Sequence, residues 1–184
     1  MVVVVGIGVY ANGDFGTPAG VREMPSALTF WLLLLAVWGS LNLVFVSGDV
    51  FTLYVALELL TFAGVPLVSL DGRGETLQAA LRYLIYALVG SMFYLLGGFL
   101  LYGAYGTLDI ALLGQRIGAE PVTWIAAASM TVGLLAKTAL FPLHLWLPPA
   151  HAGAPAAASA LLAALGCKGG WFPWGGLWGV GVPA

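Results

Sequence analysis

The chain has 184 residues, of which 61% are hydrophobic and 8% are charged. Soluble domains carry about 25% charged residues, so no globular core hides this much apolar surface, and the composition predicts an integral membrane protein. The net charge of -2 provides no basic patch and argues against a nucleic-acid partner. The single cysteine, Cys167, excludes an internal disulfide and a cysteine-based metal cluster.

The first residues do not form a complete membrane span. Residues 1–10 are apolar, but a membrane helix needs about 20 residues, so this segment is interpreted as the last turns of a helix. It has neither the basic segment nor the cleavage site of a signal peptide. Residues 11–25 contain Gly, Asn, Asp and Pro and are predicted to be a polar connection.

Longer apolar runs follow, separated by polar connections. The predicted spans are residues 26–46, 50–70, 77–102 and 122–147, and a fifth span starts at 156–168. An apolar patch at residues 110–113, within the connection 103–121, is too short to cross. Small residues recur at seven-residue spacing on the third span and predict close helix packing: Gly90, Gly97, Ser91 and Gly98. The expected fold is an all-α, polytopic transmembrane helix bundle.

Most charges lie outside these spans. The four arginines and seven of the eight acidic residues lie in connections or near span ends, whereas Glu58, Lys137 and Lys168 lie inside apolar runs. A charge at the centre of a membrane helix costs about 2.5–3.5 kcal/mol by insertion scales, so these three residues are candidates for ion or proton transfer. Tyr54 and Thr61 share the helical face of Glu58. The alternative for Glu58 is a protonated carboxyl that forms an interhelical hydrogen bond.

The region around the two lysines also contains both histidines and several prolines. Proline inside a helix removes a backbone hydrogen bond and clashes with the preceding turn. The fourth span is therefore predicted to break near Pro142 and to end at Pro148 and Pro149. Transporters build ion sites where a broken helix meets an ionisable group, and this makes His144 and His151 candidate relay or gating groups.

Two structural interpretations of this region stay open. The prolines indicate a connection between two spans, with lysines whose long side chains reach the membrane interface. The histidines, in turn, are candidates to bind carbonyl groups that the prolines leave unpaired.

Two motifs resemble a known family. Residues 137–169 carry the pattern K…P-x-H-x-W-L-P-x-A-H-x-x-A-P-x-x-x-S-A-x-L…K-x-G, and residues 48–58 read G-D-V-F-T-L-Y-V-A-L-E. They resemble the proton-conducting antiporter-like membrane subunits of complex I, Mrp-type sodium/proton antiporters and membrane-bound hydrogenases. Y-G-T-L-D at residues 105–109 matches as well. The resemblance extends over residues 26–170.

The resemblance implies a fold of about fourteen helices with an inverted repeat, of which this chain would supply an interior piece. It divides the chain into a partial helix and connection (1–25), an antiporter-like core (26–170) and a tail without family likeness (171–184). The tail is interpreted as a reading-frame change or an early stop. Pro149 departs from the family pattern, because many members have an acidic residue there.

The resemblance also implies a function. Protons would move through a relay of Glu58, Lys137 and Lys168, with His144 or His151 between them. No redox cofactor motif is present, so no cofactor is expected, and electron chemistry would belong to partner subunits in the cell membrane. The transported ion would be H+ alone, or H+ and Na+. The alternative is a truncated subunit that serves assembly or has no function.

Overall fold

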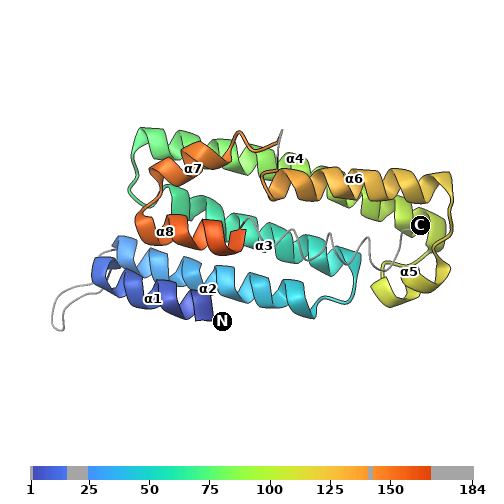
Figure 1. Cartoon of the computed structure of the whole chain (residues 1–184), viewed down its shortest axis with the longest axis horizontal. Helices are drawn as coiled ribbons and strands as arrows, with labels where there is room; N and C mark the ends of the chain where they lie inside the picture. The colour runs from blue at the N-terminus through green and yellow to red at the C-terminus, as the bar shows by residue number, and fades with distance from the viewer. Residues whose placement is uncertain (1, 16–24, 141–142, 167–184) are drawn as a thin grey trace.

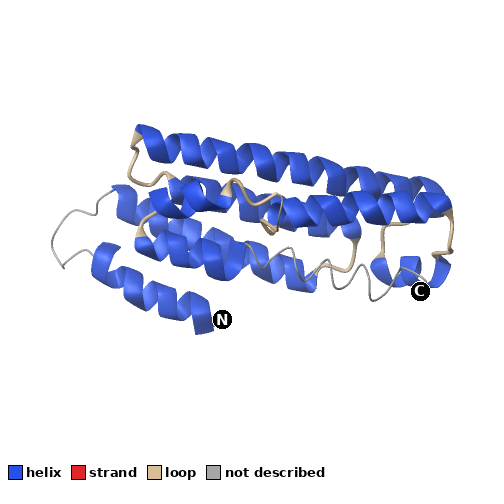
Figure 2. Ribbon diagram, turned by 45° about the horizontal axis from the view of Figure 1, so that its top comes forward, coloured by secondary structure: helices blue, strands red, loops and turns tan. Residues whose placement is uncertain are grey.

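The computed structural model describes residues 2–15, 25–140 and 143–166, which form helices and no strand. Figures 1 and 2 show the long helices lying side by side along one axis. The predicted all-α bundle is confirmed. In chain order the elements are α1 (Val2–Phe15), α2 (Pro25–Val46), α3 (Val50–Val68), α4 (Gly74–Tyr105), α5 (Ile110–Arg116), α6 (Pro121–Lys137), α7 (Leu147–Gly153), α8 (Ala156–Leu161) and the π-helix η1 (Leu162–Gly166).

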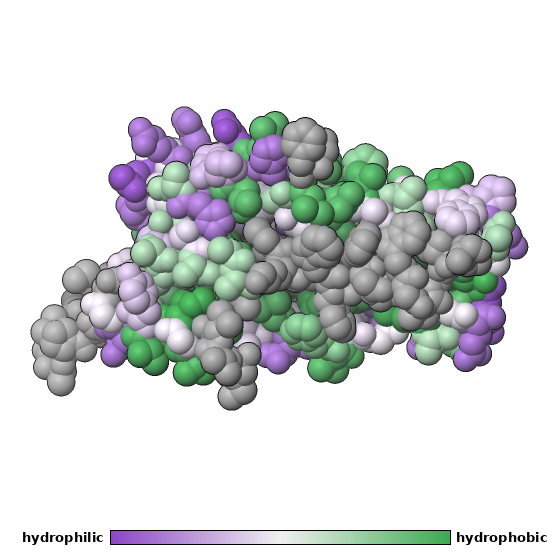
Figure 3. Space-filling view, in the orientation of Figure 1, coloured by the Kyte–Doolittle hydropathy of each residue, from purple (hydrophilic) through white to green (hydrophobic). Residues whose placement is uncertain are grey.

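Within the described ranges, three helices are long and apolar enough to cross a membrane. They are Ser26–Val46, Val50–Val68 and Gly74–Tyr105. Helix α6, with 17 residues, lies at the lower end of the range of about 17–25 residues for a span. On the face that Figure 3 shows, hydrophobic residues lie around the grey residues along the middle of the long axis, and hydrophilic residues gather at its upper left and lower right ends. This pattern indicates that the long axis crosses the bilayer.

The N-terminal helix is longer than predicted. Helix α1 continues through Ala11 and Asn12 to Phe15, so the polar connection does not begin at residue 11. Ala11 is completely buried in the cluster that α1 forms with α2, α3 and α8. This packing outweighs the weak helix propensity of the Asn and Gly residues that follow.

The predicted fourth span is two helices with a break between them. Helix α6 ends at Lys137 rather than near residue 147, and α7 begins at Leu147. In Figure 1, α6 lies along one half of α4 and α7 lies along the other half. The predicted break is confirmed, although Pro142 itself lies outside the described residues. The prediction that Pro148 and Pro149 end a helix is wrong, because they lie in the first turn of α7, where a backbone N–H has no helical partner to lose.

The end of α6 is closed by its own backbone. Ala139 has a left-handed conformation with φ of 54°. Its N–H donates to the carbonyl oxygen of Ala136 at 3.4 Å, and the N–H of Leu140 donates to that of Leu135 at 3.2 Å. This is the pattern of a Schellman cap. The cap stops α6 at Lys137 even though alanine, unlike glycine, has a penalty of about 1–2 kcal/mol in this conformation.

Helices α4 and α6 approach closely because glycines line their interface. A Cβ atom on Gly133 would lie 2.4 Å from the carbonyl oxygen of Gly90, and one on Gly97 would lie 2.4 Å from Cγ of Met130. The small face that the sequence predicts on the third span is therefore confirmed as a packing surface. It brings the end of α6 against the middle of α4.

The connection before α3 is tied to the connection before α5. Asp49 accepts a hydrogen bond from the N–H of Thr52 at 2.7 Å and caps α3, while Asp109 accepts one from the N–H of Leu112 at 2.9 Å and caps α5. An antiparallel bridge joins Asp49 and Asp109. These contacts fix the start of α3, the helix that carries Glu58.

Candidate functional site

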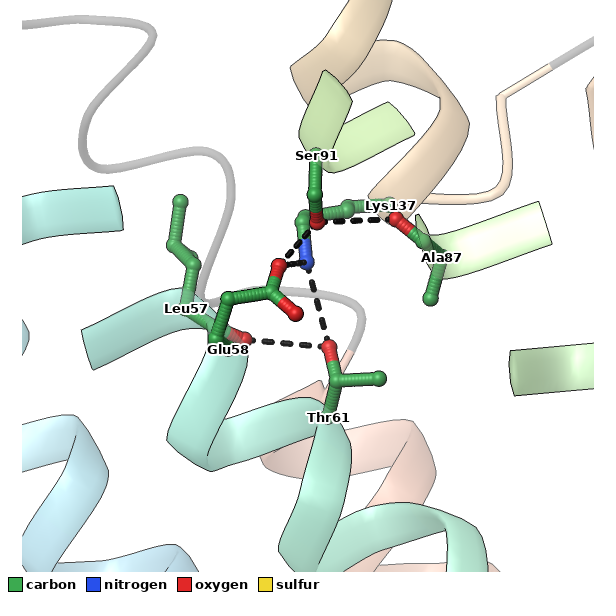
Figure 4. A network of polar contacts seen from close by, with 6 residues as sticks. All are labelled: Leu57, Glu58, Thr61, Ala87, Ser91 and Lys137. Atoms are coloured by element: carbon green, nitrogen blue, oxygen red, sulfur yellow. Dashed lines mark hydrogen bonds and ion pairs between the residues drawn. The ribbon is translucent and has the colours of Figure 1, made fainter. Parts of the chain in front are cut away.

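Glu58 of α3 and Lys137 of α6 form a buried ion pair. The Lys137 Nζ atom lies 3.0 Å from Oε1 of Glu58, and the two residues, Lys137 and Glu58, are 8% and 9% exposed. Figure 4 shows the two side chains pointing toward each other from their helices. The pairing that the family resemblance implied for these two residues is confirmed.

The helices place the two charges differently. Glu58 lies in the interior of α3, where Ala56, Leu57 and Leu60 are buried around it. Lys137 is the last residue of α6, and the partial negative charge at the carboxyl end of a helix favours a cation there. The cation is therefore supported both by a carboxylate and by the helix that carries it.

A threonine hydroxyl completes the surroundings of the cation. The Lys137 Nζ atom donates to Oγ1 of Thr61 at 3.1 Å, and the Thr61 hydroxyl donates to the carbonyl oxygen of Leu57 at 3.0 Å. Thr61 lies one turn after Glu58 on α3, as the predicted shared face requires. Its oxygen gives Lys137 a second acceptor on α3, in addition to the carboxylate of Glu58.

A serine from a third helix reaches the carboxylate. The hydroxyl of Ser91 on α4 donates to Oε1 of Glu58 and also lies 2.9 Å from the carbonyl oxygen of Ala87. The sequence pattern predicts Ser91 only on a packing face and does not reveal this contact. The available signal was a hydroxyl within the apolar run at residues 87–93 of α4.

Trp146 closes the break beside Lys137. Its Nε1 donates to the carbonyl oxygen of Ala136 at 3.1 Å, and its ring stacks on Tyr83 of α4 with centroids 4.4 Å apart and planes 10° apart. The hydroxyl of Thr138 donates to the carbonyl oxygen of Leu134 at 3.0 Å. The carbonyl oxygens of Leu134 and Ala136 also accept the backbone N–H groups of Thr138 and Ala139, so these side chains add a second hydrogen bond to each carbonyl at the end of α6. The sequence pattern predicts this role for neither Trp146 nor Thr138.

The two predicted histidines lie on the α7 side of the break. His151 of α7 has Nδ1 2.7 Å from Oγ of Ser159 on α8, so it links these two helices. His144 is half-buried in the turn that precedes α7. Lys168 lies outside the described residues, and the structure therefore describes the Glu58–Lys137 part of the predicted relay. Within the described ranges, no cluster of three His, Cys, Asp or Glu side chains is placed to hold a metal ion.

The chain is similar in sequence to known proteins. Residues 47–173 match the family described as "NADH:quinone oxidoreductase/Mrp antiporter, TM". The chain is 42% identical over 140 residues to NADH-quinone oxidoreductase subunit N of Desulforudis audaxviator, and the match covers 74% of this chain and 28% of that relative. It is 36% identical over 129 residues to an Na(+)/H(+) antiporter subunit of Bacillus subtilis, and this match covers 68% of this chain and 26% of that relative. The chain thus spans about a quarter of the length of these curated relatives.

The fold is also similar to a solved structure. A chain of the membrane-bound sulfane sulfur reductase, an archaeal respiratory membrane complex, superposes with a TM-score of 0.78 and 30% sequence identity. This match covers 94% of the present chain and 35% of the other chain. The arrangement of helices around the buried pair is therefore one that a respiratory membrane complex contains.

Proposed function

Because the chain belongs to the NADH:quinone oxidoreductase/Mrp antiporter transmembrane family, we propose that it moves protons across the cell membrane as a subunit of a larger complex. The observation that carries this proposal is the buried Glu58–Lys137 pair at the break between α6 and α7. Ionisable residues inside membrane proteins mark ion and proton pathways, and interrupted helices form the sites of many transporters.

Lys137 is the proton carrier of the proposed pathway. Burial disfavours an isolated ammonium group, whereas a carboxylate at hydrogen-bond distance favours it. The distance between Nζ of Lys137 and Oε1 of Glu58, 3.0 Å in the closed pair, therefore controls whether Lys137 keeps its proton. When the pair opens, Lys137 releases the proton along water molecules toward Lys168.

Lys168 is the proposed acceptor, because no second acidic residue lies in an apolar run to pair with it. His144 or His151 would relay the proton between the two lysines. A structural role is the alternative for His151, and its contact with Ser159 favours that role. Lys168→Arg should reduce transport nearly as much as Lys168→Ala, since a guanidinium keeps its proton, whereas Lys168→His should retain more transport.

The proposed partners are other membrane subunits and the lipid bilayer. Similar chains occur in a respiratory membrane complex and in proteins named as NADH-quinone oxidoreductase and Na(+)/H(+) antiporter subunits. The proposed cargo is H+, with Na+ as a second ion if the chain serves an antiporter. Electron transfer would belong to the partner subunits. The family match over residues 47–173 supports the proposed antiporter-like core at 26–170.

Proton uptake into sealed vesicles that contain the assembled complex tests this function. Glu58→Ala and Lys137→Ala should each remove most of the uptake, measured with a pH-sensitive dye at matched expression. Arg73→Ala is the matched control, because it removes a cation from an exposed ion pair. Near-normal uptake in both Glu58→Ala and Lys137→Ala would refute the proposed pathway.

A further inference from the structure

The Ser91 hydroxyl lies between two acceptors. Ser91 is 2% exposed, and its oxygen contacts Oε1 of Glu58 on one side and the carbonyl oxygen of Ala87, 2.9 Å away, on the other. Figure 4 shows both contacts. A hydroxyl has a single hydrogen atom, so Ser91 donates fully to one of these two oxygens at a time.

The charge of Glu58 decides which oxygen receives this hydrogen. An ionised carboxylate is the better acceptor, because hydrogen bonds to charged groups are about twice as strong as those between neutral groups. After Glu58 takes up a proton, the carbonyl of Ala87 becomes the better acceptor. The oxygen of Ser91 then accepts the hydrogen of the neutral carboxyl group. Ser91 therefore has a hydrogen-bonded arrangement for each charge state of Glu58.

The other hydroxyl of the site does not alternate in this way. Thr61 donates to the carbonyl oxygen of Leu57 while its oxygen accepts from Lys137. Both of its contacts are compatible with one hydrogen atom, so Thr61 supports the cation without reorienting. Ser91 is the hydroxyl whose donor bond depends on the carboxyl group.

Lys137 is the charged group that faces Glu58. The phenol of Tyr54 on α3 also interacts with the charge of Glu58. The other packed helices add little charge at this depth. Helix α2 has no charged residue, α6 has none besides Lys137, and α8 and η1 have none. On α4, Glu75 and Arg82 are exposed. On α7, His151 contacts Ser159 of α8.

We propose that Ser91 is a positioning residue that keeps Glu58 ionised while Lys137 moves away. This inference rests on the proposed function, since it concerns the opening of the same pair. Without Ser91, an open pair leaves the buried carboxylate with neither donor, and Glu58 takes back the proton that Lys137 releases. With Ser91 present, the carboxylate keeps a donor, and the proton from Lys137 moves onward. The hydroxyl thus directs the proton away from Glu58.

Infrared titration of the chain in phospholipid vesicles tests this role without transport. The stretching band of the protonated Glu58 carboxyl group is followed with pH, and Glu58→Gln identifies the band by removing it. Ser91→Ala should move the midpoint of the titration by about one pH unit toward alkaline pH, because a hydrogen bond to the charged form is lost. Ser91→Thr keeps the hydroxyl and should keep the wild-type midpoint.

Ser40→Ala is the matched control. Ser40 of α2 is also a buried helical serine, and its hydroxyl donates to the carbonyl oxygen of Ala36 at 2.7 Å. This substitution should leave the Glu58 midpoint unchanged. If Ser91→Ala does not fold, Ser91→Cys supplies the test, since a thiol is a weak donor and should move the midpoint in the same direction.

Several outcomes would overturn the role of Ser91. They are an unchanged midpoint in Ser91→Ala, an equal change in Ser91→Thr or Ser40→Ala, and a wild-type chain in which Glu58 does not titrate. The infrared measurement tests the role of Ser91, whereas the transport measurement tests the proposed function, so one proposal can be refuted without the other. A shifted midpoint in a complex that takes up no protons refutes the proposed function and supports the role of Ser91. Normal proton uptake with an unchanged midpoint refutes the role of Ser91 and supports the proposed function.

Discussion

The described part of the chain contains two ion pairs in very different surroundings. The side chains of Lys137 and Glu58 are 7% and 12% exposed, whereas those of Arg73 and Asp71 are 66% and 27% exposed. The first pair joins residues 79 positions apart, and the second joins residues two positions apart. A turn between helices is enough to form the exposed pair. The buried pair needs three helices to meet, with α4 supplying Ser91.

This difference decides what each pair contributes. Water and salt screen an exposed pair, so its loss changes little. Removing one member of a buried pair leaves an uncompensated charge in apolar surroundings, which is strongly destabilising. A buried pair is suited to proton transfer, because a small change in the distance between its two charged groups changes their preferred protonation state.

The largest effect is expected when the buried pair is broken on one side. Lys137→Ala or Glu58→Ala should lower the free energy of unfolding by about 3–5 kcal/mol. Denaturant titration in detergent micelles, followed by circular dichroism, measures this change. The double variant Glu58→Gln with Lys137→Met removes both charges and should recover most of the stability while proton uptake stays absent. A double variant as unstable as either single variant would contradict this account.

The next largest effect is expected at the interface that holds the pair together. Gly133→Ala would place a Cβ atom 2.4 Å from the carbonyl oxygen of Gly90 and should separate α4 from α6. Overpacking of this kind lowers stability by about 1–3 kcal/mol. The matched control is Gly39→Ala on α2, whose Cβ atom would meet nothing within 4 Å. Equal stability of the two variants in the same unfolding experiment would show that this interface tolerates the added atom.

A smaller effect is expected at the break beside Lys137. Trp146→Phe keeps an aromatic ring to stack on Tyr83 but removes the hydrogen bond to the carbonyl oxygen of Ala136. The loss should be about 1 kcal/mol in the free energy of unfolding. Trp124→Phe is a suitable control, since Trp124 is exposed on α6. If both substitutions change stability equally, the Trp146 hydrogen bond does not hold the end of α6.

The smallest effect is expected at the exposed pair. Arg73→Ala should leave the unfolding transition at neutral pH unchanged within error. The hydrogen bond from Thr76, together with those from Arg73, lowers the pKa of Asp71 below its ordinary value. A lowered folded-state pKa means that the stabilising contribution is present above the unfolded value of about 3.9. It is lost as the pH falls through the folded value.

Acid unfolding of Asp71→Asn tests this contribution. The variant should lose less stability than the wild type as the pH falls below about 4, because its amide does not titrate. The same pH series on Arg73→Ala separates the contribution of Arg73 from that of Thr76. Identical acid branches for Asp71→Asn and the wild type would show that Asp71 has no part in the pH dependence.

Much of the architecture follows from local composition. Each predicted run that begins at residue 26, 50 or 77 forms a long apolar helix, and the resemblance to antiporter-like subunits is confirmed by the match over residues 47–173. Glu58 and Lys137 stand out because charges inside apolar runs have a high solvation penalty. These features need no knowledge of which helices meet.

The errors concern helix ends and uncharged partners. Proline suggested an end at Pro148 and Pro149, yet the same ring is well suited to the first turn of a helix, and these prolines begin α7. The Schellman cap at Ala139 ends α6 without the usual glycine. Ser91 lies among small residues on α4, so its sequence context indicates packing alone.

The amino-acid sequence by itself determined the membrane class, the long apolar helices, the small face of α4 and the isolation of Glu58 and Lys137. All of these depend on residues that are close together along the chain. The tertiary structure alone decided that Ser91 and Thr61 surround the pair and that Trp146 closes the break. Hydrogen bonds are short and directional. Common side chains therefore form them only where packing brings a donor and an acceptor atom from distant parts of the chain to within about 3 Å.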